Sequence, residues 1–389
     1  MSEFDDIRPF NDDEISAALQ RIIASDDCLN LVIRLHFGLF ISYFSFILRP
    51  LVRYRLKLAS RKIHTLKQFQ SLVAGYLESM LDKTTTGVTL LGLENIDLSE
   101  PALFISNHRD IALDSSIVNY AMYTNGAETV RSATGDNLMT KPFVSDLFRA
   151  NKCFVVKRNL GGPRELLKSL KKLSSYIYHS IKVDGQKVWI AQKEGRAKDG
   201  LDNTDPAIIK MLTISKSKDT DFSEYIRKLR IIPVSISYEL DPCDAMKAKE
   251  LSSIDKNGAY KKTHDEDVNS IGKGIIGNKG HIFLSFGAML NGQYNNADEV
   301  AKILDKSIIE NYQLQGTNWL AYEMQHGISA SIKASRAIYN SEDAKPVLSD
   351  DEIISFTNRI QEIPESARFC ALNAYSNPIV SRLRLISLG

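Results

Sequence analysis

The sequence lacks the residue patterns that mark several large classes of protein. Its four cysteines contain no CxxC pair, and its seven histidines contain no HExxH motif. These absences predict neither a disulfide framework nor a metal site, and they favour a reducing compartment. No GxSxG motif is present, so a serine nucleophile of the hydrolase type is not indicated. A chain of 389 residues that is 43% hydrophobic is long enough to bury a core without such supports.

Acidic residues are missing from a long stretch near the amino terminus. Between Cys28 and Leu77 there is no Asp or Glu, whereas eight lysines and arginines fall there. Since the net charge of the chain is +2, this stretch carries +8 and the rest −6. A block of this kind predicts an anionic partner surface. Apart from Tyr54, the basic residues are not interleaved with aromatic side chains that would stack on bases, so we do not predict a nucleic-acid partner.

Long hydrophobic runs are also absent. The apolar part of residues 29–51 covers only about 37–48, and a helix needs about 20 residues to cross a bilayer. Because this part is rich in aromatics and precedes the basic run, we predict that residues 1–84 form a helical, membrane-associating segment. The alternative is a buried hydrophobic helix followed by a solvated basic one. The acidic, polar start of the chain predicts no cleavable signal. We therefore expect a peripheral or monotopic protein on the cytoplasmic face of a membrane.

Strand and helix signals alternate from about residue 86. Short runs rich in Val and Ile, separated by amphipathic helices, predict an α/β core over 85–290, with a mixed, mostly parallel sheet flanked by helices. Residues 251–280 are polar and contain several glycines, so we expect a long loop there. Residues 291–389 are expected to be a helical carboxy-terminal region. The predicted strands cover 88–93, 102–107, 129–134, 153–158, 187–192, 229–239 and 281–287.

The densest polar group in an apolar setting follows the second predicted strand. It consists of Asn107, His108, Arg109, Asp110 and, at the expected start of a helix, Asp114. A histidine with a carboxylate about one turn away is the arrangement that a general base needs, because the carboxylate fixes the imidazole tautomer and stabilises the imidazolium. The end of a strand in an α/β sheet is where ligands bind.

Two more charged groups follow predicted strands. Strand 153–158 ends in Lys157 and Arg158, and strand 187–192 is followed by Lys193, Glu194, Gly195 and Arg196. A glycine in such a turn allows the guanidinium to lie beside backbone amides, which suits a phosphate group. The alternative for each group is a charged turn on the surface with no ligand.

In this order, the groups resemble the glycerolipid acyltransferase family, which includes glycerol-3-phosphate and 1-acylglycerol-3-phosphate acyltransferases. The matching blocks are Asn107-His108 with Asp114, Val155 to Arg158, Trp189 to Arg196, and the strand segment Ile232-Pro233-Val234-Ser235. Two departures stand out. Five residues separate His108 from Asp114, where the family usually has four, so that either Asp114 or Asp110 can be the orienting acid. Lys193 replaces a proline that is common in the family.

The resemblance implies an O-acyltransferase of phospholipid biosynthesis that needs no cofactor. It implies His108 as the base, with Asp114 or Asp110 as its partner, acting on an acyl-CoA or acyl carrier protein thioester. The acceptor is expected to be lysophosphatidate or glycerol 3-phosphate. The residues implied in substrate binding are Asn107, Arg109, Arg158, Lys193, Glu194, Gly195 and Arg196.

Two other functions fit the same scaffold. One is a lipid-binding or tethering protein, and the other is a hydrolase that releases acyl groups to water. A dinucleotide site is not predicted, although residues 272–277 fit GxGxxG, because they precede a strand instead of following one.

Overall fold

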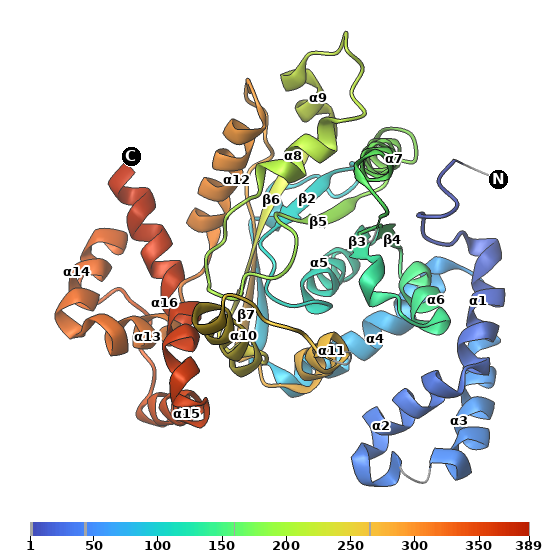
Figure 1. Cartoon of the computed structure of the whole chain (residues 1–389), viewed down its shortest axis with the longest axis horizontal. Helices are drawn as coiled ribbons and strands as arrows, with labels where there is room; N and C mark the ends of the chain where they lie inside the picture. Colours follow the sequence, from blue (N-terminus) through green and yellow to red (C-terminus); the bar gives the residue numbers. More distant parts are fainter. Residues whose placement is uncertain (1–2, 43–44, 159, 264–265, 389) are drawn as a thin grey trace.

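The computed structural model describes residues 3–42, 45–158, 160–263 and 266–388, and the side chains of residues 35–42 lie outside the description. Within these ranges seven strands form one sheet (Figure 1). The strands are β1 (Gly87–Leu91), β2 (Leu103–Ser106), β3 (Arg131–Gly135), β4 (Cys153–Val156), β5 (Val188–Ala191), β6 (Ile231–Tyr238) and β7 (His281–Phe286).

Helices precede, connect and follow these strands. The amino-terminal helices are α1 (Asp12–Ala24), α2 (Asp26–Ser42), α3 (Ser45–Ser60) and α4 (Leu66–Thr84). Those between strands are α5 (Leu113–Thr124), α6 (Pro142–Ala150), α7 (Pro163–Lys182), α8 (Pro206–Thr213), α9 (Phe222–Leu229), α10 (Asp244–Asn257) and α11 (Glu266–Ile276). After the last strand come α12 (Ala297–Asn311), α13 (Gly316–His326), α14 (Ile328–Tyr339), α15 (Asp350–Glu362) and α16 (Glu365–Leu388).

The strand order in the described sheet is β1-β7-β6-β2-β5-β3-β4. All neighbouring strands run parallel except β6 and β7, which are antiparallel. The prediction of a mixed, mostly parallel sheet flanked by helices is confirmed. Pro233 lies in β6 one residue before the pairing with β7 begins at Val234, so its missing N–H costs that ladder no hydrogen bond.

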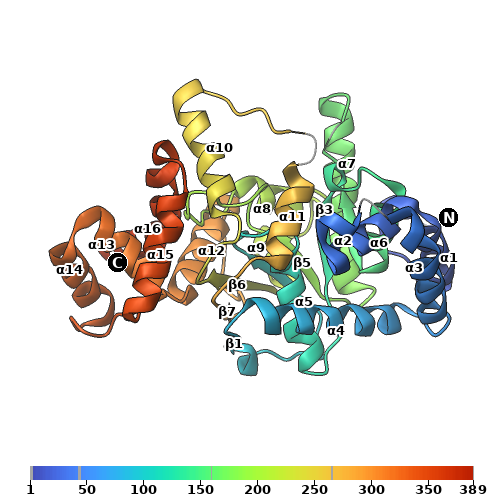
Figure 2. The ribbon, with the colours of Figure 1, turned by 90° about the horizontal axis from the view of Figure 1, so that it is seen from below.

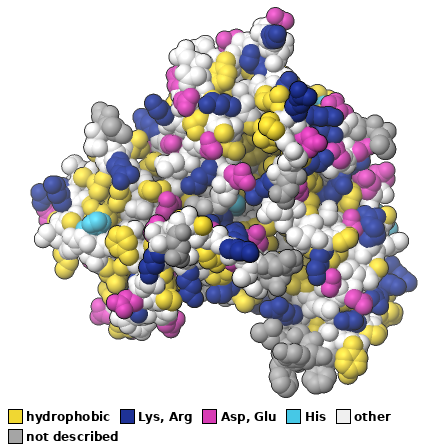
Figure 3. Space-filling view, viewed as in Figure 1, with side chains coloured by type: hydrophobic (Ala, Val, Ile, Leu, Met, Phe, Trp, Pro, Cys, Tyr) yellow, Lys and Arg dark blue, Asp and Glu magenta, His cyan; other side chains and the backbone are white. Residues whose placement is uncertain are grey.

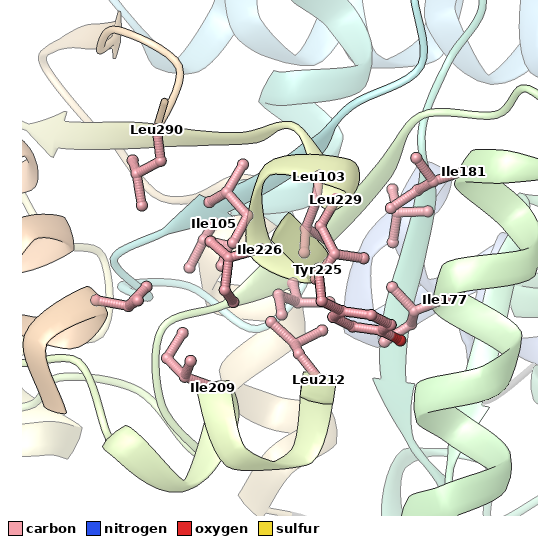
Figure 4. Close-up of a cluster of buried hydrophobic side chains, with 14 of the residues drawn as sticks. Leu103, Ile105, Ile177, Ile181, Ile209, Leu212, Tyr225, Ile226, Leu229 and Leu290 are labelled. Atoms are coloured by element: carbon pink, nitrogen blue, oxygen red, sulfur yellow. The ribbon is translucent and has the colours of Figure 1, made fainter. Parts of the chain in front are cut away.

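The sheet is buried on both faces, as its apolar strands predict. Side chains of β2 alternate between two clusters: Leu103 and Ile105 pack with α7, α8, α9 and α12, whereas Phe104 packs with α4 and α5. Figure 4 shows the first of these clusters around Leu103 and Ile105. Helix α12 contributes Val300 and Leu304 to it, so the helix that follows the last strand completes the core of the sheet.

Two helical groups lie at opposite ends of the molecule (Figure 2). At one end α1 packs against α6, α2 and α3. At the other end α16 packs against α10, α13, α14 and α15. The helical carboxy-terminal region is therefore present, as predicted.

One sequence prediction about local structure is wrong. Residues 251–280 are not a long loop, because α10 ends at Asn257 and α11 covers Glu266–Ile276. Two of the glycines that suggest a loop, Gly274 and Gly277, lie where an added Cβ would meet Asp110 and Pro242, whereas Gly272 would meet nothing within 4 Å. Within 29–51, α2 ends at Ser42, and α3 begins at Ser45 and continues through Pro50 into the basic run. Most side chains of the apolar part 37–48 lie outside the described residues.

Candidate active site

The imidazole of His108 is held by the carboxylate of Asp114. His108 lies in the turn between β2 and α5, and Asp114 lies in the first turn of α5. The Nδ1 atom of His108 is 2.7 Å from Oδ2 of Asp114. Trp189 of β5 packs edge-on against the imidazole, with 6.0 Å between the ring centroids. The side chain of His108 is 15% exposed, and no described residue bonds its Nε2, which leaves that nitrogen open to a substrate.

Asp114 is fully buried, and both of its oxygens accept hydrogen bonds. Oδ2 accepts the backbone N–H groups of Arg109 at 2.6 Å and Asp110 at 3.0 Å. Oδ1 accepts the hydroxyl of Tyr238, on β6, at 2.9 Å. Burial, together with the Asp114 carboxylate, raises the pKa of Tyr238 well above its ordinary value, so the phenol stays a donor. These bonds satisfy the buried carboxylate and fix it in place.

Asp110, the other candidate partner of His108, bonds the backbone of α5 instead of the imidazole. Its Oδ1 accepts the backbone N–H groups of Ala112 and Leu113, both at 2.9 Å. It therefore caps the start of α5, which is the role that short acidic side chains fill at helix starts. Burial raises the pKa of Asp110, and the neighbouring Asp114 raises it further. The geometry favours Asp114 as the orienting acid.

Asn107 and Arg109 are occupied inside the protein, so the prediction that they contact substrate finds no support in the structure. Asn107 is fully buried and exchanges hydrogen bonds with the backbone of Ile236 on β6. Arg109 is buried with Asp202 and lies 5.4 Å from the ring centre of Tyr312. Burial alone would lower the pKa of Arg109, but the Asp202 carboxylate raises that pKa overall. Both residues position the turn that carries His108.

The turn after β5 lies beside the His108 turn. Its Ala197 N–H donates to the carbonyl of His108 at 2.7 Å. Gly195 has φ +77°, a left-handed backbone that favours glycine, and a Cβ added there would meet open space. Such a turn leaves room for a ligand next to its backbone.

The charged side chains of these turns are exposed or half-buried, in contrast to Asn107 and Arg109. Arg158 follows β4 and pairs with Glu194 at 3.4 Å. Lys193 donates to the carbonyl of Leu201 at 3.2 Å, and Arg196 donates to the hydroxyl of Ser270, on α11, at 2.7 Å. The sheet thus brings together the three groups that are distant in sequence, at the carboxyl ends of its parallel strands.

Several residues that support the site gave no signal in the sequence. Besides Tyr238 and Asp202, these include Lys247 of α10, which is buried, donates to the Arg109 carbonyl at 2.6 Å and pairs with Asp241. Burial alone would raise the pKa of Asp241, but the Lys247 ammonium lowers that pKa overall. Such partners come from elements that only the tertiary fold brings near.

No three His, Cys, Asp or Glu side chains of the described residues meet in a way that suits a metal ion. The expectation that the protein needs no metal stays a prediction.

Comparison with known proteins agrees with the motifs. Residues 87–236, less than half of the chain, match the model of a protein family described as Acyltransferase. No curated protein matches the chain in sequence. Among solved structures, it is similar to the 1-acyl-sn-glycerophosphate (LPA) acyltransferase PlsC from Thermotoga maritima, with 13% identity and a TM-score of 0.39. That alignment covers 76% of this chain and 91% of that one.

We predict that Arg109 and Asp202 stabilise the fold only as a pair. Removing one partner of a buried ion pair leaves an uncompensated charge, so Arg109→Met should lower the free energy of unfolding by about 3–5 kcal/mol. Arg109→Met combined with Asp202→Leu should recover most of that loss, because no buried charge is left alone. Urea unfolding of the three proteins measures both effects. A double variant no more stable than Arg109→Met would contradict the account.

Proposed function

We propose that the chain transfers a fatty acyl group from an acyl-CoA or acyl carrier protein thioester to a hydroxyl of a glycerol-phosphate-type acceptor. The observation that carries the proposal is the His108–Asp114 pair with Nε2 left open, at a strand end where the cations of Arg158, Lys193 and Arg196 surround the same edge of the sheet.

In the proposed reaction, Nε2 of His108 takes the proton of the acceptor hydroxyl. Asp114, bonded to Nδ1, stabilises the imidazolium that forms. The alkoxide attacks the thioester carbonyl, and the tetrahedral oxyanion is stabilised by backbone N–H groups near Gly195. Collapse of this intermediate breaks the carbon–sulfur bond, and the imidazolium returns its proton to the departing thiolate. No covalent bond to the protein is formed.

Arg158, Lys193 and Arg196 are proposed to bind the acceptor phosphate. Arginine side chains form paired hydrogen bonds with phosphate oxygens, and Lys193 adds a third cation. Glu194 pairs with Arg158, which orients that guanidinium and leaves Glu194 in position for a glycerol hydroxyl. Lysophosphatidate and glycerol 3-phosphate both present a phosphate and a free hydroxyl, so both are candidate acceptors.

The experiment that tests the reaction uses purified full-length protein with anionic vesicles, labelled acyl-CoA or acyl carrier protein thioester, and each acceptor in turn. His108→Ala should lose about 10²–10⁴-fold in rate, the usual contribution of a general base. The rate of Asp114→Asn should also fall steeply, because a neutral amide does not stabilise the imidazolium. Asp110→Asn should stay close to the wild-type rate, since its amide oxygen still caps α5.

The same assay separates the proposed transferase from the two alternative functions. Thioester cleavage at the same rate with and without acceptor would show a hydrolase. Binding to vesicles with no transfer to any acceptor would contradict the enzyme proposal and favour a lipid-binding or tethering protein.

We also propose that α3 docks on an anionic membrane. Four of its apolar side chains are exposed at the spacing of one helix face: Ile47, Leu51, Tyr54 and Leu58. Exposed basic residues of the same stretch border them: Arg55, Lys57, Arg61 and Lys62. Figure 3 shows hydrophobic and basic side chains side by side where α3 lies in Figure 1. A helix with one apolar and one basic face binds at the headgroup boundary. None of the helices in the described ranges has both the length and the apolar content to cross a bilayer.

Co-sedimentation with vesicles tests this surface. Leu51→Ser with Tyr54→Ser should weaken binding to vesicles that contain phosphatidic acid, because about 1.5–3 kcal/mol is at stake for each large apolar side chain buried. The matched control is Val347→Ser with Ile354→Ser, which changes two exposed apolar side chains of the carboxy-terminal region. Equal binding by the two double variants would contradict docking through α3.

A further inference from the structure

Helix α11 touches two separate groups of active-site residues. It lies in the segment that follows β6 and α10, far in sequence from both groups. Its buried positions are Ser270 and Gly274, one helical turn apart. Small residues on one face let the backbone of a helix approach its neighbour closely. The face of α11 that meets the active site is thus built for close approach rather than for apolar packing.

Gly274 packs directly against Asp110. A Cβ added to Gly274 would lie 2.3 Å from Oδ2 of Asp110, a distance at which one of the two must move. The carboxylate has little freedom to do so, because it is buried and its other oxygen holds the N–H groups of Ala112 and Leu113. Gly272, two residues earlier on the same helix, would meet nothing within 4 Å.

Ser270 holds the second group. Its hydroxyl accepts a hydrogen bond from Arg196 at 2.7 Å, and it is also 3.2 Å from Sγ of the buried Cys243. Arg196 is half-buried, and Ser270 is the partner that fixes its guanidinium at one nitrogen. The other nitrogens of the fork donate no hydrogen bond to another described residue, and they can therefore meet an anion.

The carboxyl end of α11 is anchored by a buried lysine. Lys279 donates to the carbonyls of Ile275 at 3.2 Å and Gly277 at 2.7 Å, and to the hydroxyl of Thr84 on α4 at 2.8 Å. A cation at this end also favours the helix dipole. The anchor fixes where Gly274 meets Asp110.

We infer that α11 is a positioning element of the active site, acting through Gly274 on the Asp110 cap of α5 and through Ser270 on the guanidinium of Arg196. The inference rests on the proposed function for its kinetic consequences. Contact with Asp110 holds the start of α5, which carries Asp114 and so aligns His108. Contact with Ser270 holds Arg196 where the acceptor phosphate is proposed to bind. Gly274 and Ser270 are positioning residues, since neither is placed against a reacting atom.

The test compares Gly274→Ala with Gly272→Ala, which make the same chemical change on the same helix. Gly274→Ala should lower kcat by about 100-fold, because a shift of about 1 Å at reacting groups costs that much, while KM for the thioester stays the same. Gly272→Ala should keep wild-type kcat. A serine at position 110 still offers an oxygen to the N–H groups of α5, but its side chain is shorter and leaves room for the added Cβ. The double variant Gly274→Ala with Asp110→Ser should therefore have the same kcat as Asp110→Ser alone.

Ser270→Ala tests the other contact. It should raise KM for the acceptor several-fold and leave kcat unchanged, because only the placement of Arg196 is lost. In a background of Arg196→Gln, the change at Ser270 should have no further effect on KM. Equal effects of Ser270→Ala with and without Arg196 would contradict this half of the inference.

Amide hydrogen exchange gives a readout that does not depend on activity. Gly274→Ala should speed exchange at Ala112 and Leu113, whose N–H groups bond to Asp110, whereas Gly272→Ala should not. If wild-type protein transfers no acyl group, the proposed function fails, and the exchange comparison alone decides the role of α11. If wild-type protein is active and the two glycine variants agree in both kcat and exchange, the inference is wrong and the proposed function stands.

Discussion

The structure depends on one buried carboxylate. Asp114 lies at the start of α5 with no exposed surface, and a charge in that position persists only if donors surround it. It receives the imidazole of His108, two consecutive backbone N–H groups and the phenol of Tyr238. Those donors come from a loop and from β6, so the same bonds that satisfy the carboxylate also fix the shape of the turn and the orientation of the base.

The rest of the fold supplies that turn with rigid surroundings. Strand β2 lies inside the sheet, between β5 and β6, and its last residues lead into Asn107 and His108. Asn107 bonds the His108 turn to β6, and Arg109 bonds it to Asp202. Ala197 bonds the turn after β5 to the His108 turn. Because neighbouring strands here run parallel, their following turns meet at one edge, and residues nearly 90 positions apart in sequence become neighbours. Buried polar bonds of this kind cost much to break one at a time, which favours a single arrangement of the site.

The sequence predicts the sheet well, because apolar strands of four to eight residues bounded by turns are a strong local signal. The sequence also identifies His108 and two candidate carboxylates, but their spacing alone does not show which carboxylate orients the imidazole. The choice depends on where α5 begins: Asp110 faces the free N–H groups of the first turn, and Asp114 points back to the imidazole. Asn107 and Arg109 look like ligand-binding residues in sequence, but their partners Ile236 and Asp202 are revealed only by the fold. The glycines at 272–277 suggest a loop for a similar reason, since a helix can contain glycines where it packs closely against another side chain, as Gly274 does against Asp110.

The account rests on His108 carrying its proton on Nδ1, towards Asp114, with Nε2 free. Nitrogen-15 NMR of histidine-labelled protein, with the His108 signals identified by their loss in His108→Gln, measures this directly. At a pH where the ring is neutral, the account predicts a protonated Nδ1 and an unprotonated Nε2 in the wild-type protein, and loss of that preference in Asp114→Asn. A proton on Nε2 in the wild-type protein, or the same tautomer in both proteins, would contradict it.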